Sequence, residues 1–384
     1  MLKNKKIKIM LVGGGTAGHI NPLLAIYAAT MKLEKVKNGE ISPCFIYVGN
    51  PGAFTDKFNE SNIPTRKIVS SKLRRYAFWD NLFELPKFIF SFLQSLWYVF
   101  LEKPDIVFSK GGPSSLAPVI AARFFIITVI IHESDAEPSI TTKLTAPFAK
   151  KIFLAFEDAR ERLSLKHQKK CVIIGNPLRL SFLEDLPSQH TAKINLGLNP
   201  KKFLIVIIGG SQGSQRINNL IIESLPQILA LDIQVLHQTG AKLFKEVSEA
   251  VSSNFGSLKK IESSGYRATE FFNENIKDVL VAADIIISRA GSSIFEFAAL
   301  GKPSILIPLP ESAQNHQLKN ALSYEHAGAC IMLTEDKIST PLFIETLKQL
   351  ITNPSLLQKM SESAKKFAKP EASRQIAAEL LELP

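Results

Sequence analysis

Cysteine is scarce in this chain. Only Cys44, Cys171 and Cys330 occur among its 384 residues, and they lie far apart in the sequence. Three isolated cysteines indicate neither a disulfide framework nor a zinc site, because both use cysteines at paired spacings. We therefore expect three small, buried apolar side chains in a protein of a reducing compartment.

A long uninterrupted apolar run is also missing. The most apolar stretch, residues 82–101, is broken by charged side chains, Pro86 and Gln94. Its uninterrupted length falls short of the ~20 residues that cross a bilayer. The earlier apolar stretch, residues 7–12, is too short for a signal-peptide core and ends in glycines. We expect the protein to stay in the cytosol or on the cytoplasmic face of the membrane.

Acidic residues are outnumbered, with 35 Asp and Glu against 46 Lys and Arg, and the net charge is +11. The first 100 residues hold 14 basic and 6 acidic side chains. No known nucleic-acid-binding motif accompanies this charge, so we do not expect a nucleic-acid partner.

Part of the basic excess lies next to aromatic side chains, in residues 71–79, directly before the apolar stretch 82–101. An anionic bilayer attracts such a segment, because cations bring the protein in and apolar side chains then enter the headgroup region. We predict membrane contact here; the alternative is a core helix beside a solvated basic loop. The side chains assigned to this surface are Leu73, Arg74, Arg75, Phe78 and Trp79.

Two glycine-rich turns are the most informative features that the chain does contain. The apolar residues 7–12 lead into Gly13, Gly14 and Gly15, and the apolar residues 203–208 lead into Gly209 and Gly210. A parallel strand that delivers a bare-backbone turn to a helix N-terminus forms a cradle for anions. Two such turns, half a chain apart, predict two nucleotide-binding halves with a cleft between them.

The pattern between these turns alternates between apolar strands and helices. This alternation predicts an α/β fold with two doubly wound parallel sheets, in domains of roughly 150 to 200 residues each. We place the first domain at 1–176 and the second at 177–365, with a helix at about 366–384 that packs back on the first. The polar residues 181–202 are expected to connect them. The predicted strands are 7–12, 44–48, 105–109, 126–131, 151–154, 172–174, 203–208, 233–237, 285–288 and 304–307.

Polar loops follow four more of the predicted strands, at the strand ends where α/β folds place their sites. Each loop on its own could be structural, with glycines turning the chain and polar groups capping helices. Together they predict polar groups around one cleft. The loops are Lys110–Ser115, His132–Asp135, Arg289–Ser293 with Glu296, and Pro308–Gln317.

The order of these motifs resembles the MurG family of bacterial N-acetylglucosamine transferases. The resemblance covers Lys8 to about Gly328 and rests on GGGTAGHINP, KGGPSS, HESDAEP, GNPLR, GGSQGSQRIN, HQTG, SRAGSSIFEF and PLPESAQNHQLKNA. It implies a GT-B fold, that is, two facing Rossmann-like domains with the lipid acceptor on the first and the UDP-sugar on the second. It also implies inverting transfer of N-acetylglucosamine from UDP to the C4 hydroxyl of undecaprenyl-pyrophosphoryl-MurNAc-pentapeptide, which converts lipid I to lipid II in peptidoglycan synthesis.

The resemblance gives His19 the role of the base, for which an imidazole has a suitable pKa; the alternative is a histidine that only stabilises the turn. Glu296 would accept hydrogen bonds from the ribose hydroxyls, or else only stabilise a helix N-terminus. The donor-binding set implied is Thr16, Ala17, Gly18, Arg179, Ser211, Gln212, Gly213, Phe272, Asn273, Gly291, Ser292, Ser293, Glu296, His316 and Gln317. The acceptor-binding set implied is Gly14, Gly15, Asn21, Gly111, Gly112, Glu133 and Asp135.

Three residues depart from the family pattern: Ala17 replaces a glycine, Asp135 replaces an asparagine, and Pro113 stands where an aromatic is usual. No Asp-x-Asp pair is present, and helix N-termini can take the place of a cation at a diphosphate, so we expect no metal and no cofactor. Glu133 and Asp135 are the nearest approach to a carboxylate pair, and we assign them to the acceptor loop.

Three other functions share some of these features. A glycosyltransferase acting on diacylglycerol would have the same donor loops and membrane segment, but the KGG and HESD loops argue against it. An epimerase of UDP-N-acetylglucosamine would need no membrane segment. A catalytically silent nucleotide-sugar binding protein would not need His19. We expect UDP-N-acetylglucosamine, the lipid-linked acceptor and an anionic membrane as partners, at the cytoplasmic face of the inner membrane.

Overall fold

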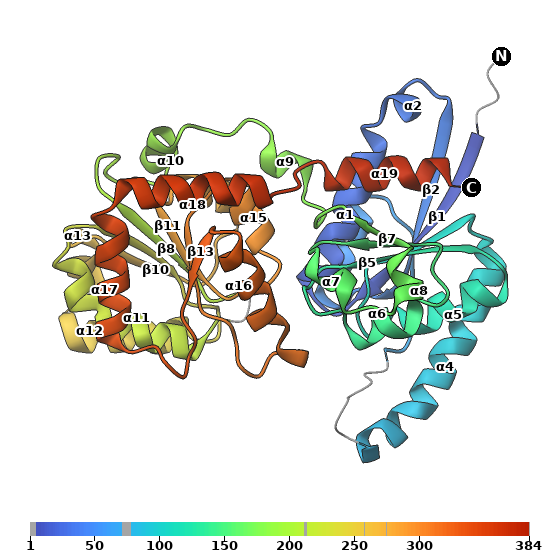
Figure 1. Ribbon diagram of the computed structural model, residues 1–384, viewed down its shortest axis with the longest axis horizontal. Coiled ribbons are helices and arrows are strands. Elements are labelled where there is room, and N and C mark those ends of the chain that lie inside the picture. Colours follow the sequence, from blue (N-terminus) through green and yellow to red (C-terminus); the bar gives the residue numbers. More distant parts are fainter. Residues whose placement is uncertain (1–4, 71–77, 211–212, 257, 274, 384) are drawn as a thin grey trace. The chain divides into compact units, whose positions relative to one another are not determined.

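The computed structural model describes residues 5–70, 78–210, 213–256, 258–273 and 275–383, with backbone alone at 78–83 and 258–260. The chain divides into two compact units, which are described here separately. The first unit is Met1–Ser181 together with Lys369–Pro384, and the second is Phe182–Ala368. Each unit is one parallel β-sheet with helices on both faces (Figure 1). The α/β class of two parallel Rossmann-like sheets is confirmed.

The sheet of the first unit has seven strands in the order β3-β2-β1-β4-β5-β6-β7. Alternate residues of its central strand enter opposite core layers: Ile9 and Leu11 enter one, and Met10 and Val12 the other. A strand that is apolar on both sides is what a parallel sheet covered on both faces requires. The strands are β1 (Lys5–Gly14), β2 (Ile41–Asn50), β3 (Thr65–Lys67), β4 (Ile106–Ser109), β5 (Thr128–Glu133), β6 (Lys151–Leu154) and β7 (Cys171–Ile173).

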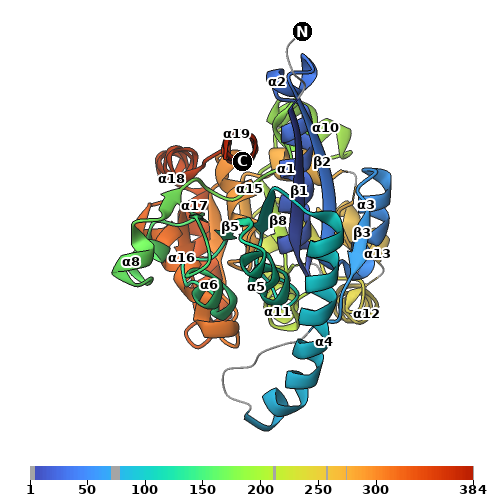
Figure 2. The same cartoon turned by 90° about the vertical axis from the view of Figure 1, so that its right-hand side faces the viewer.

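Helices α1 and α19 lie side by side on one face of this sheet, and α4 and α5 lie together on the other (Figures 1 and 2). Ile376, Leu380 and Leu381 of α19 share a core layer with Ile9 of β1. The end of the chain therefore completes the core that its beginning started. The helices are α1 (Ala17–Met31), α2 (Glu34–Lys37), η1 (Gly52–Phe54), α3 (Thr55–Glu60), α4 (Phe78–Glu102), α5 (Leu116–Phe124), α6 (Ile140–Thr145), α7 (Asp158–Glu161), α8 (Leu165–Gln168) and α19 (Ala372–Glu382). A short helix, α9 (Leu180–Leu183), spans the boundary between Ser181 and Phe182 at which the two units divide.

The sheet of the second unit has six parallel strands in the order β10-β9-β8-β11-β12-β13. All five residues of its central strand, β8, are buried. Its neighbour β11 is buried along its whole length as well. The strands are β8 (Leu204–Ile208), β9 (Gln234–Gln238), β10 (Tyr266–Thr269), β11 (Ile285–Ser288), β12 (Ser304–Leu306) and β13 (Cys330–Met332).

The helices of the second unit also form two layers. Ile217 of α11 and Phe343 of α17 share one core cluster, whereas Phe297 of α15 and Tyr324 of α16 share the other. The helices are α10 (Gln189–Asn195), α11 (Gln215–Leu229), α12 (Phe244–Phe255), α13 (Leu258–Ser263), α14 (Ile276–Ala282), α15 (Ile294–Ala299), η2 (Ala313–Asn315), α16 (His316–His326), α17 (Thr340–Ile351) and α18 (Pro354–Phe367).

Two expectations from the sequence need correction. Cys330 is buried, but Cys171 is only partly buried and Cys44 is exposed. Cys44 lies opposite Lys8, near the solvent-accessible beginnings of β1 and β2. The polar residues 181–202 are not a bare connection: they include α10, whose Ala192 is fully buried in the core of the second unit. Short strands β3, β10 and β13 were not predicted at all.

Candidate active site

The first glycine turn lies between β1 and α1 and has no room for side chains. A Cβ on Gly14 would lie 2.7 Å from the carbonyl oxygen of Asn50, and Gly15 has a φ of +95°. Both positions therefore require glycine. The amides of Ala17 and Gly18, in the first turn of α1, have no acceptor within the helix. The turn thus offers backbone donors to an anionic oxygen.

His19 is the third residue of α1, and two other residues lie close to one edge of its imidazole ring. The Oγ1 atom of Thr16 lies 3.0 Å from Nδ1. A Cβ built on Gly112 would lie 3.3 Å from Cε1 and 3.4 Å from Nδ1 of the same ring, and Gly112 has a φ of +88°. The first glycine turn and the KGG loop therefore meet at this histidine, which is partly buried.

Lys110 begins the KGG loop after β4 and is almost fully buried, with 2% of its surface exposed. Its ammonium group donates a hydrogen bond to the hydroxyl of Ser134 in the HESD loop. This contact joins the loops that follow the neighbouring strands β4 and β5. The sequence did not suggest this role for Lys110.

Glu133, the last residue of β5, is buried and holds the HESD loop together. One carboxylate oxygen accepts the amides of Ser134 at 2.8 Å and Asp135 at 3.1 Å. The other accepts the amide of Ser139 at 2.8 Å and the hydroxyl of Thr142 at 2.6 Å. With four donors on its two oxygens, Glu133 holds the shape of the loop. The other carboxylate of the HESD loop, Asp135, is partly buried.

Electrostatics in this cluster keep the histidine neutral. Burial and the nearby Lys110 ammonium lower the pKa of His19 to about 4, and the Asp135 carboxylate opposes this shift. Burial also lowers the pKa of Lys110 to about 8, against the attraction of Glu133 and Asp135. Burial and the neighbouring Asp135 raise the pKa of Glu133. At neutral pH His19 can therefore accept a proton.

The other predicted residues of the first unit lie in the KGG loop, in α1 and after the Gly175 turn. Gly111 is left-handed, with a φ of +81°. Asn21 is partly buried in α1, and Arg179 is exposed beyond the Gly175 turn. That turn is attached to β5, because a ring nitrogen of the buried His132 lies 2.8 Å from the carbonyl oxygen of Gly175.

The second glycine turn connects β8 to α11. Gly210 and Gly213 have φ values of +95° and +80°, and a Cβ on Gly213 would lie 2.1 Å from the carbonyl oxygen of Thr239. Ser214 then caps α11 by accepting the amide of Ile217. Two predicted donor residues of this turn, Ser211 and Gln212, lie outside the described residues.

A buried arginine, Arg289, supports this turn from the neighbouring strand. It follows β11 and donates hydrogen bonds to the hydroxyl of Ser214 at 2.6 Å and to the carbonyl oxygen of Ile307 at 3.0 Å. It also forms an ion pair of 2.5 Å with Glu335, which pairs in turn with Arg216 of α11. This network joins segments far apart in the sequence, and no local motif indicates it.

The RAGSS loop after Arg289 leads into α15. A Cβ on Gly291 would meet nothing within 4 Å, so the space beside it is open. Ser292 and Ser293 are partly buried at the start of the helix, and Glu296 lies in its first turn, also partly buried. The loop therefore presents small polar groups and a carboxylate at one helix N-terminus.

Gln238, at the end of β9, connects the loop of Phe272 and Asn273 to the second glycine turn. Its side chain accepts the amide of Phe272 at 2.9 Å and donates to the carbonyl oxygen of Gly210 at 3.2 Å. Phe272 is buried and Asn273 is exposed. The HQTG motif therefore fixes the position of this loop, a role that the sequence did not reveal.

Gln317, at the start of α16, uses its side-chain oxygen in a hydrogen bond within the protein. Its carbonyl oxygen accepts the amide of Leu309 at 3.0 Å, so its NH₂ group is the one it can offer a ligand. The neighbouring His316 ring nitrogen lies 2.8 Å from the carbonyl oxygen of Ala313. Gln314 and Asn315 are left-handed, which gives this loop a sharp turn.

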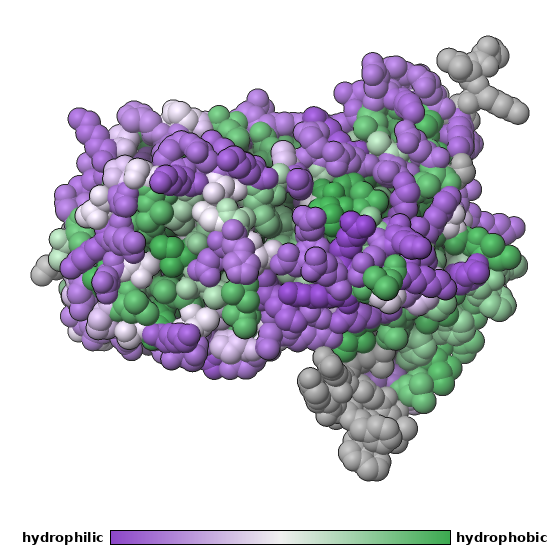
Figure 3. All heavy atoms as spheres, viewed as in Figure 1, coloured by the Kyte–Doolittle hydropathy of each residue, from purple (hydrophilic) through white to green (hydrophobic). Residues whose placement is uncertain are grey.

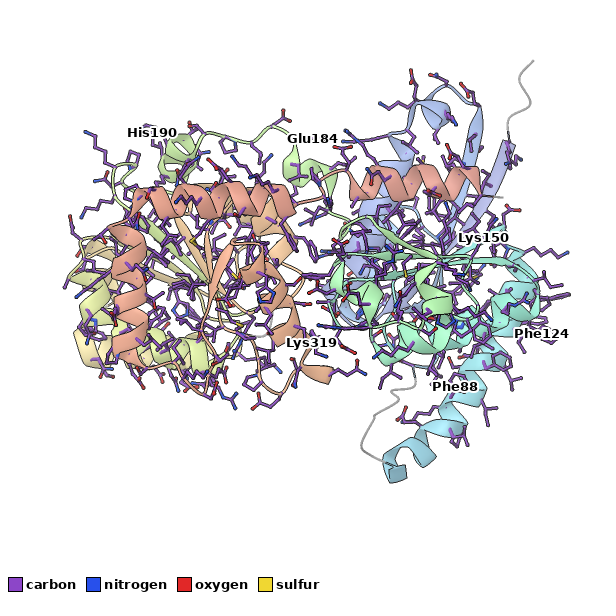
Figure 4. The ribbon with its side chains drawn as sticks, viewed as in Figure 1. Phe88, Phe124, Lys150, Glu184, His190 and Lys319 are labelled. Atoms are coloured by element: carbon purple, nitrogen blue, oxygen red, sulfur yellow. The ribbon has the colours of Figure 1, made fainter. Side chains whose placement is uncertain are left out.

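An exposed apolar surface extends along α4 and the end of α5 in the first unit. Trp97 and Phe100 have 58% and 52% of their surfaces exposed, and their rings lie 6.4 Å apart. Phe124 and Ile126 extend the surface with 70% and 82% exposed. Figure 3 shows the apolar side chains of this region together, and Figure 4 shows Phe124 on the outer side. We call it the α4–α5 apolar face; it comprises Leu85, Ile89, Phe90, Leu93, Trp97, Phe100, Leu101, Phe124 and Ile126.

The predicted membrane residues precede this face in the sequence. Leu73, Arg74 and Arg75 fall outside the described residues, and Phe78 and Trp79 begin α4, where only the backbone is described. No described helix has both the length and the apolar character needed to cross a bilayer. The sequence analysis noted the apolar stretch 82–101 but did not single out the exposed side chains of α4 within it.

Known protein families match both units. Residues 9–154 match the glycosyltransferase family 28 N-terminal domain, and residues 204–376 match the family 28 C-terminal domain. A relative in Caldicellulosiruptor saccharolyticus, named UDP-N-acetylglucosamine–N-acetylmuramyl-(pentapeptide) pyrophosphoryl-undecaprenol N-acetylglucosamine transferase, is 33% identical over 98% of this chain and 97% of its own. A relative in Clostridium botulinum with the same name is 35% identical over 91% of each chain.

Solved structures share the fold. MurG of Acinetobacter baumannii has a TM-score of 0.72 at 21% identity, covering 98% of this chain and 100% of its own. The UDP-GlcNAc 2-epimerase of Neisseria meningitidis has a TM-score of 0.66 at 18% identity, covering 98% and 99%. The fold is thus common to transferases and epimerases, and the full-length identity decides between them. On that evidence, this chain belongs to the MurG family of UDP-N-acetylglucosamine transferases, within glycosyltransferase family 28.

Proposed function

We propose that this protein moves N-acetylglucosamine from UDP-N-acetylglucosamine to the C4 hydroxyl of undecaprenyl-pyrophosphoryl-MurNAc-pentapeptide, the step that makes lipid II for peptidoglycan. The observation that carries the proposal is the identity of 33% over 98% of the chain with relatives named for this reaction. The neutral His19, held at the first glycine turn, supports it with a chemical group suited to the reaction.

His19 acts as the base in this proposal. It takes the proton of the C4 hydroxyl as that oxygen bonds to the anomeric carbon of N-acetylglucosamine, and the bond from that carbon to UDP breaks with inversion. A histidine of low pKa is unprotonated and ready at neutral pH. Asp135 stabilises the imidazolium that forms, since opposite charges attract.

The acceptor pyrophosphate is bound, in this proposal, by backbone donors of the first glycine turn and of the KGG loop. Gly15 and Gly111 leave their backbones open to a close approach, because a Cβ on either would meet nothing nearer than 4.0 Å, whereas Gly14 and Gly112 let the two loops pack together. Glu133 contributes by shaping the HESD loop through its four hydrogen bonds. Electrostatic stabilisation by preorganised donors costs no reorganisation during the reaction.

The donor is bound mainly by the second unit. Backbone donors beside Gly213 and Gly291, with Ser292, stabilise the diphosphate as negative charge grows on the leaving UDP. Glu296 accepts the ribose hydroxyls, and the loop at Asn273 reads the uracil edge. The NH₂ group of Gln317 remains for the sugar, because its oxygen is bonded to Leu309.

The protein reaches its lipid-linked acceptor, in this proposal, by docking the α4–α5 apolar face on the cytoplasmic face of the plasma membrane. Leu93, Trp97 and Phe124 are each more than half exposed on that face. Apolar side chains grouped on one surface mark an interaction site, and the basic residues Arg74 and Arg75 precede it in the sequence.

A transfer assay tests the proposal. Radiolabelled UDP-N-acetylglucosamine is incubated with the lipid-linked muramoyl-pentapeptide, with diacylglycerol, or with no acceptor, and the products are separated by thin-layer chromatography. We expect label in the lipid-linked disaccharide only. Labelled glycosyl-diacylglycerol would instead identify a lipid glycosyltransferase, and labelled UDP-N-acetylmannosamine without an acceptor would identify a 2-epimerase.

A further inference from the structure

Thr16 stands at the N-cap of α1 without capping the helix. Its backbone has the extended conformation usual at this position, with φ −142° and ψ 163°, yet its side chain makes no hydrogen bond to a helix amide. An N-cap hydroxyl normally accepts the amide of the second or third helical residue. Here the hydroxyl lies 3.0 Å from Nδ1 of His19 instead.

Other helices of the same chain show that this arrangement follows from the histidine. Six described α-helices have Ser or Thr at an extended N-cap, and four of these side chains accept the amide of the third helical residue. The two exceptions are Thr16 and Ser164, and both have a histidine at that third position. Ser164 likewise lies 3.0 Å from Nδ1 of His167. The pattern Ser/Thr-x-x-His therefore directs the hydroxyl to the imidazole.

The surroundings of the two pairs differ. The cations that act on His167 are Lys166 and Lys170, with no anion opposing them. The groups that act on His19 are Lys110 of the KGG loop and Asp135 of the HESD loop, which have opposite signs. Gly112 also packs against the edge of the His19 ring that carries Nδ1 and Cε1. Of the two pairs, Thr16 and His19 therefore lie in the candidate active site, whereas Ser164 and His167 do not.

The neutral imidazole of His19 carries one N–H, and its position decides whether the ring can act as the base. If the Thr16 hydroxyl donated to Nδ1, Nε2 would hold the proton and could not take another. Nε2 makes no hydrogen bond to any residue that the structure describes. We infer that Thr16 Oγ1 accepts the Nδ1–H of His19 and so reserves the Nε2 lone pair for the acceptor hydroxyl. This inference rests on the function proposed above.

The same bond persists when the proton is transferred. The C4 hydroxyl proton passes to Nε2 as its oxygen bonds to the anomeric carbon and UDP departs, which leaves an imidazolium. Nδ1–H still donates to Thr16, and the bond becomes charge-assisted and stronger. Thr16 is therefore a positioning residue that acts through His19, besides the donor contact that the sequence predicted for it.

Two substitutions separate this role from a purely structural one. Thr16→Val keeps the branched shape and removes the hydroxyl, and we expect kcat to fall about 10- to 100-fold, because a base in the wrong tautomer is impaired. The KM for UDP-N-acetylglucosamine should stay within about twofold, since the base acts on the acceptor and valine keeps any donor contact made through the backbone of residue 16. Thr16→Ser restores the hydroxyl and should recover most of kcat.

The tautomer itself can be measured by imidazole ¹⁵N NMR of the full-length protein, with the His19 signals assigned by His19→Gln. We expect the Nδ1–H form in the wild type and a shift toward the Nε2–H form in Thr16→Val. The matched control is Ser164→Ala, which should change the His167 signals and leave kcat unchanged.

An Nε2–H tautomer of His19 in the wild-type protein would overturn the inference, whatever the activity. A raised KM with unchanged kcat in Thr16→Val would also overturn it and leave only the donor contact. Absence of transfer by a wild-type protein whose His19 is in the Nδ1–H form would overturn the proposed function alone.

Discussion

The guanidinium of Arg289 donates a hydrogen bond of 2.6 Å to the hydroxyl of Ser214. This bond joins the end of β11 to the N-cap of α11, and the same arginine is paired with Glu335 at 2.5 Å. Both partners of that ion pair are about nine-tenths buried. The support of the second glycine turn is therefore a buried ion pair, which is costly to break because Glu335 then keeps only the exposed Arg216 as a partner.

Replacement of Arg289 by methionine should destabilise the second unit. The change leaves Glu335 with only the exposed Arg216 as a cation and removes the donor to Ser214, which together cost roughly 2 to 3 kcal/mol of unfolding free energy. UDP affinity should fall as well, because Ser214 loses a partner beside the glycine turn. Chemical denaturation and calorimetric titration with UDP measure the two effects.

Arg216→Met provides the comparison, because Arg216 is 55% exposed although it pairs with the same Glu335. An exposed ion pair contributes about 0 to 1 kcal/mol, so the loss should be much smaller. Equal losses in the two variants would show that Arg289 has no special role.

Replacement of Glu296 by alanine should weaken UDP-sugar binding by about 1 to 3 kcal/mol, because the ribose hydroxyls lose a charged acceptor. Calorimetry gives the affinity directly. Glu223→Ala, at an exposed position of α11, serves as the control and should bind like the wild type. Unchanged affinity in Glu296→Ala would leave this carboxylate only a role at the start of α15.

The acid limb of the pH profile of kcat/KM should move when the charges beside His19 change. The base is active when neutral, so activity falls as pH drops through its pKa, which is about 4. Lys110→Met removes a cation, raises that pKa and moves the limb to higher pH. Asp135→Asn removes an anion and moves it to lower pH. If the acid limb stays at the same pH in both variants, it reports the titration of a group other than His19.

Replacement of Leu93 and Trp97 by glutamine should reduce binding to anionic vesicles by at least tenfold. Each change removes about 1 to 2 kcal/mol of apolar transfer into the lipid interface. Both side chains are more than half exposed, so the fold should be little affected. Flotation with vesicles measures binding, and Leu165→Gln, 79% exposed on α8, is the control away from the α4–α5 apolar face. Equal binding by all three proteins would exclude this face.

The sequence was sufficient for the central strands and for the glycine turns. Strands β1 and β8 contain short apolar runs that lead into glycines, and both turns lie where they were expected. Of the four edge strands, β7 was predicted and β3, β10 and β13 were not. The residues of β3, Thr65, Arg66 and Lys67, carry little signal, and this strand is held by pairing with β2. Pairing with a neighbour, and not local propensity, makes such strands.

The candidate site was predictable as a set of loops but not as a set of contacts. The HESD motif placed Glu133 at the right strand end, yet its four bonds depend on how the chain folds back through Ser139 and Thr142. The pair of Arg289 and Glu335 joins residues far apart in sequence, and no periodicity reports such a contact. The roles of Lys110 and Gln238 are of the same kind.

The return of α19 to the first unit also affects the order of events during synthesis. Ile376, Leu380 and Leu381 fill the core layer that Ile9 begins, so translation must pass Leu381 before that core can close. The second unit, 182–368, has all its residues by then and is free to fold earlier, since domains generally fold as units during synthesis. Although its strands emerge first from the ribosome, the N-terminal unit is the last to be finished.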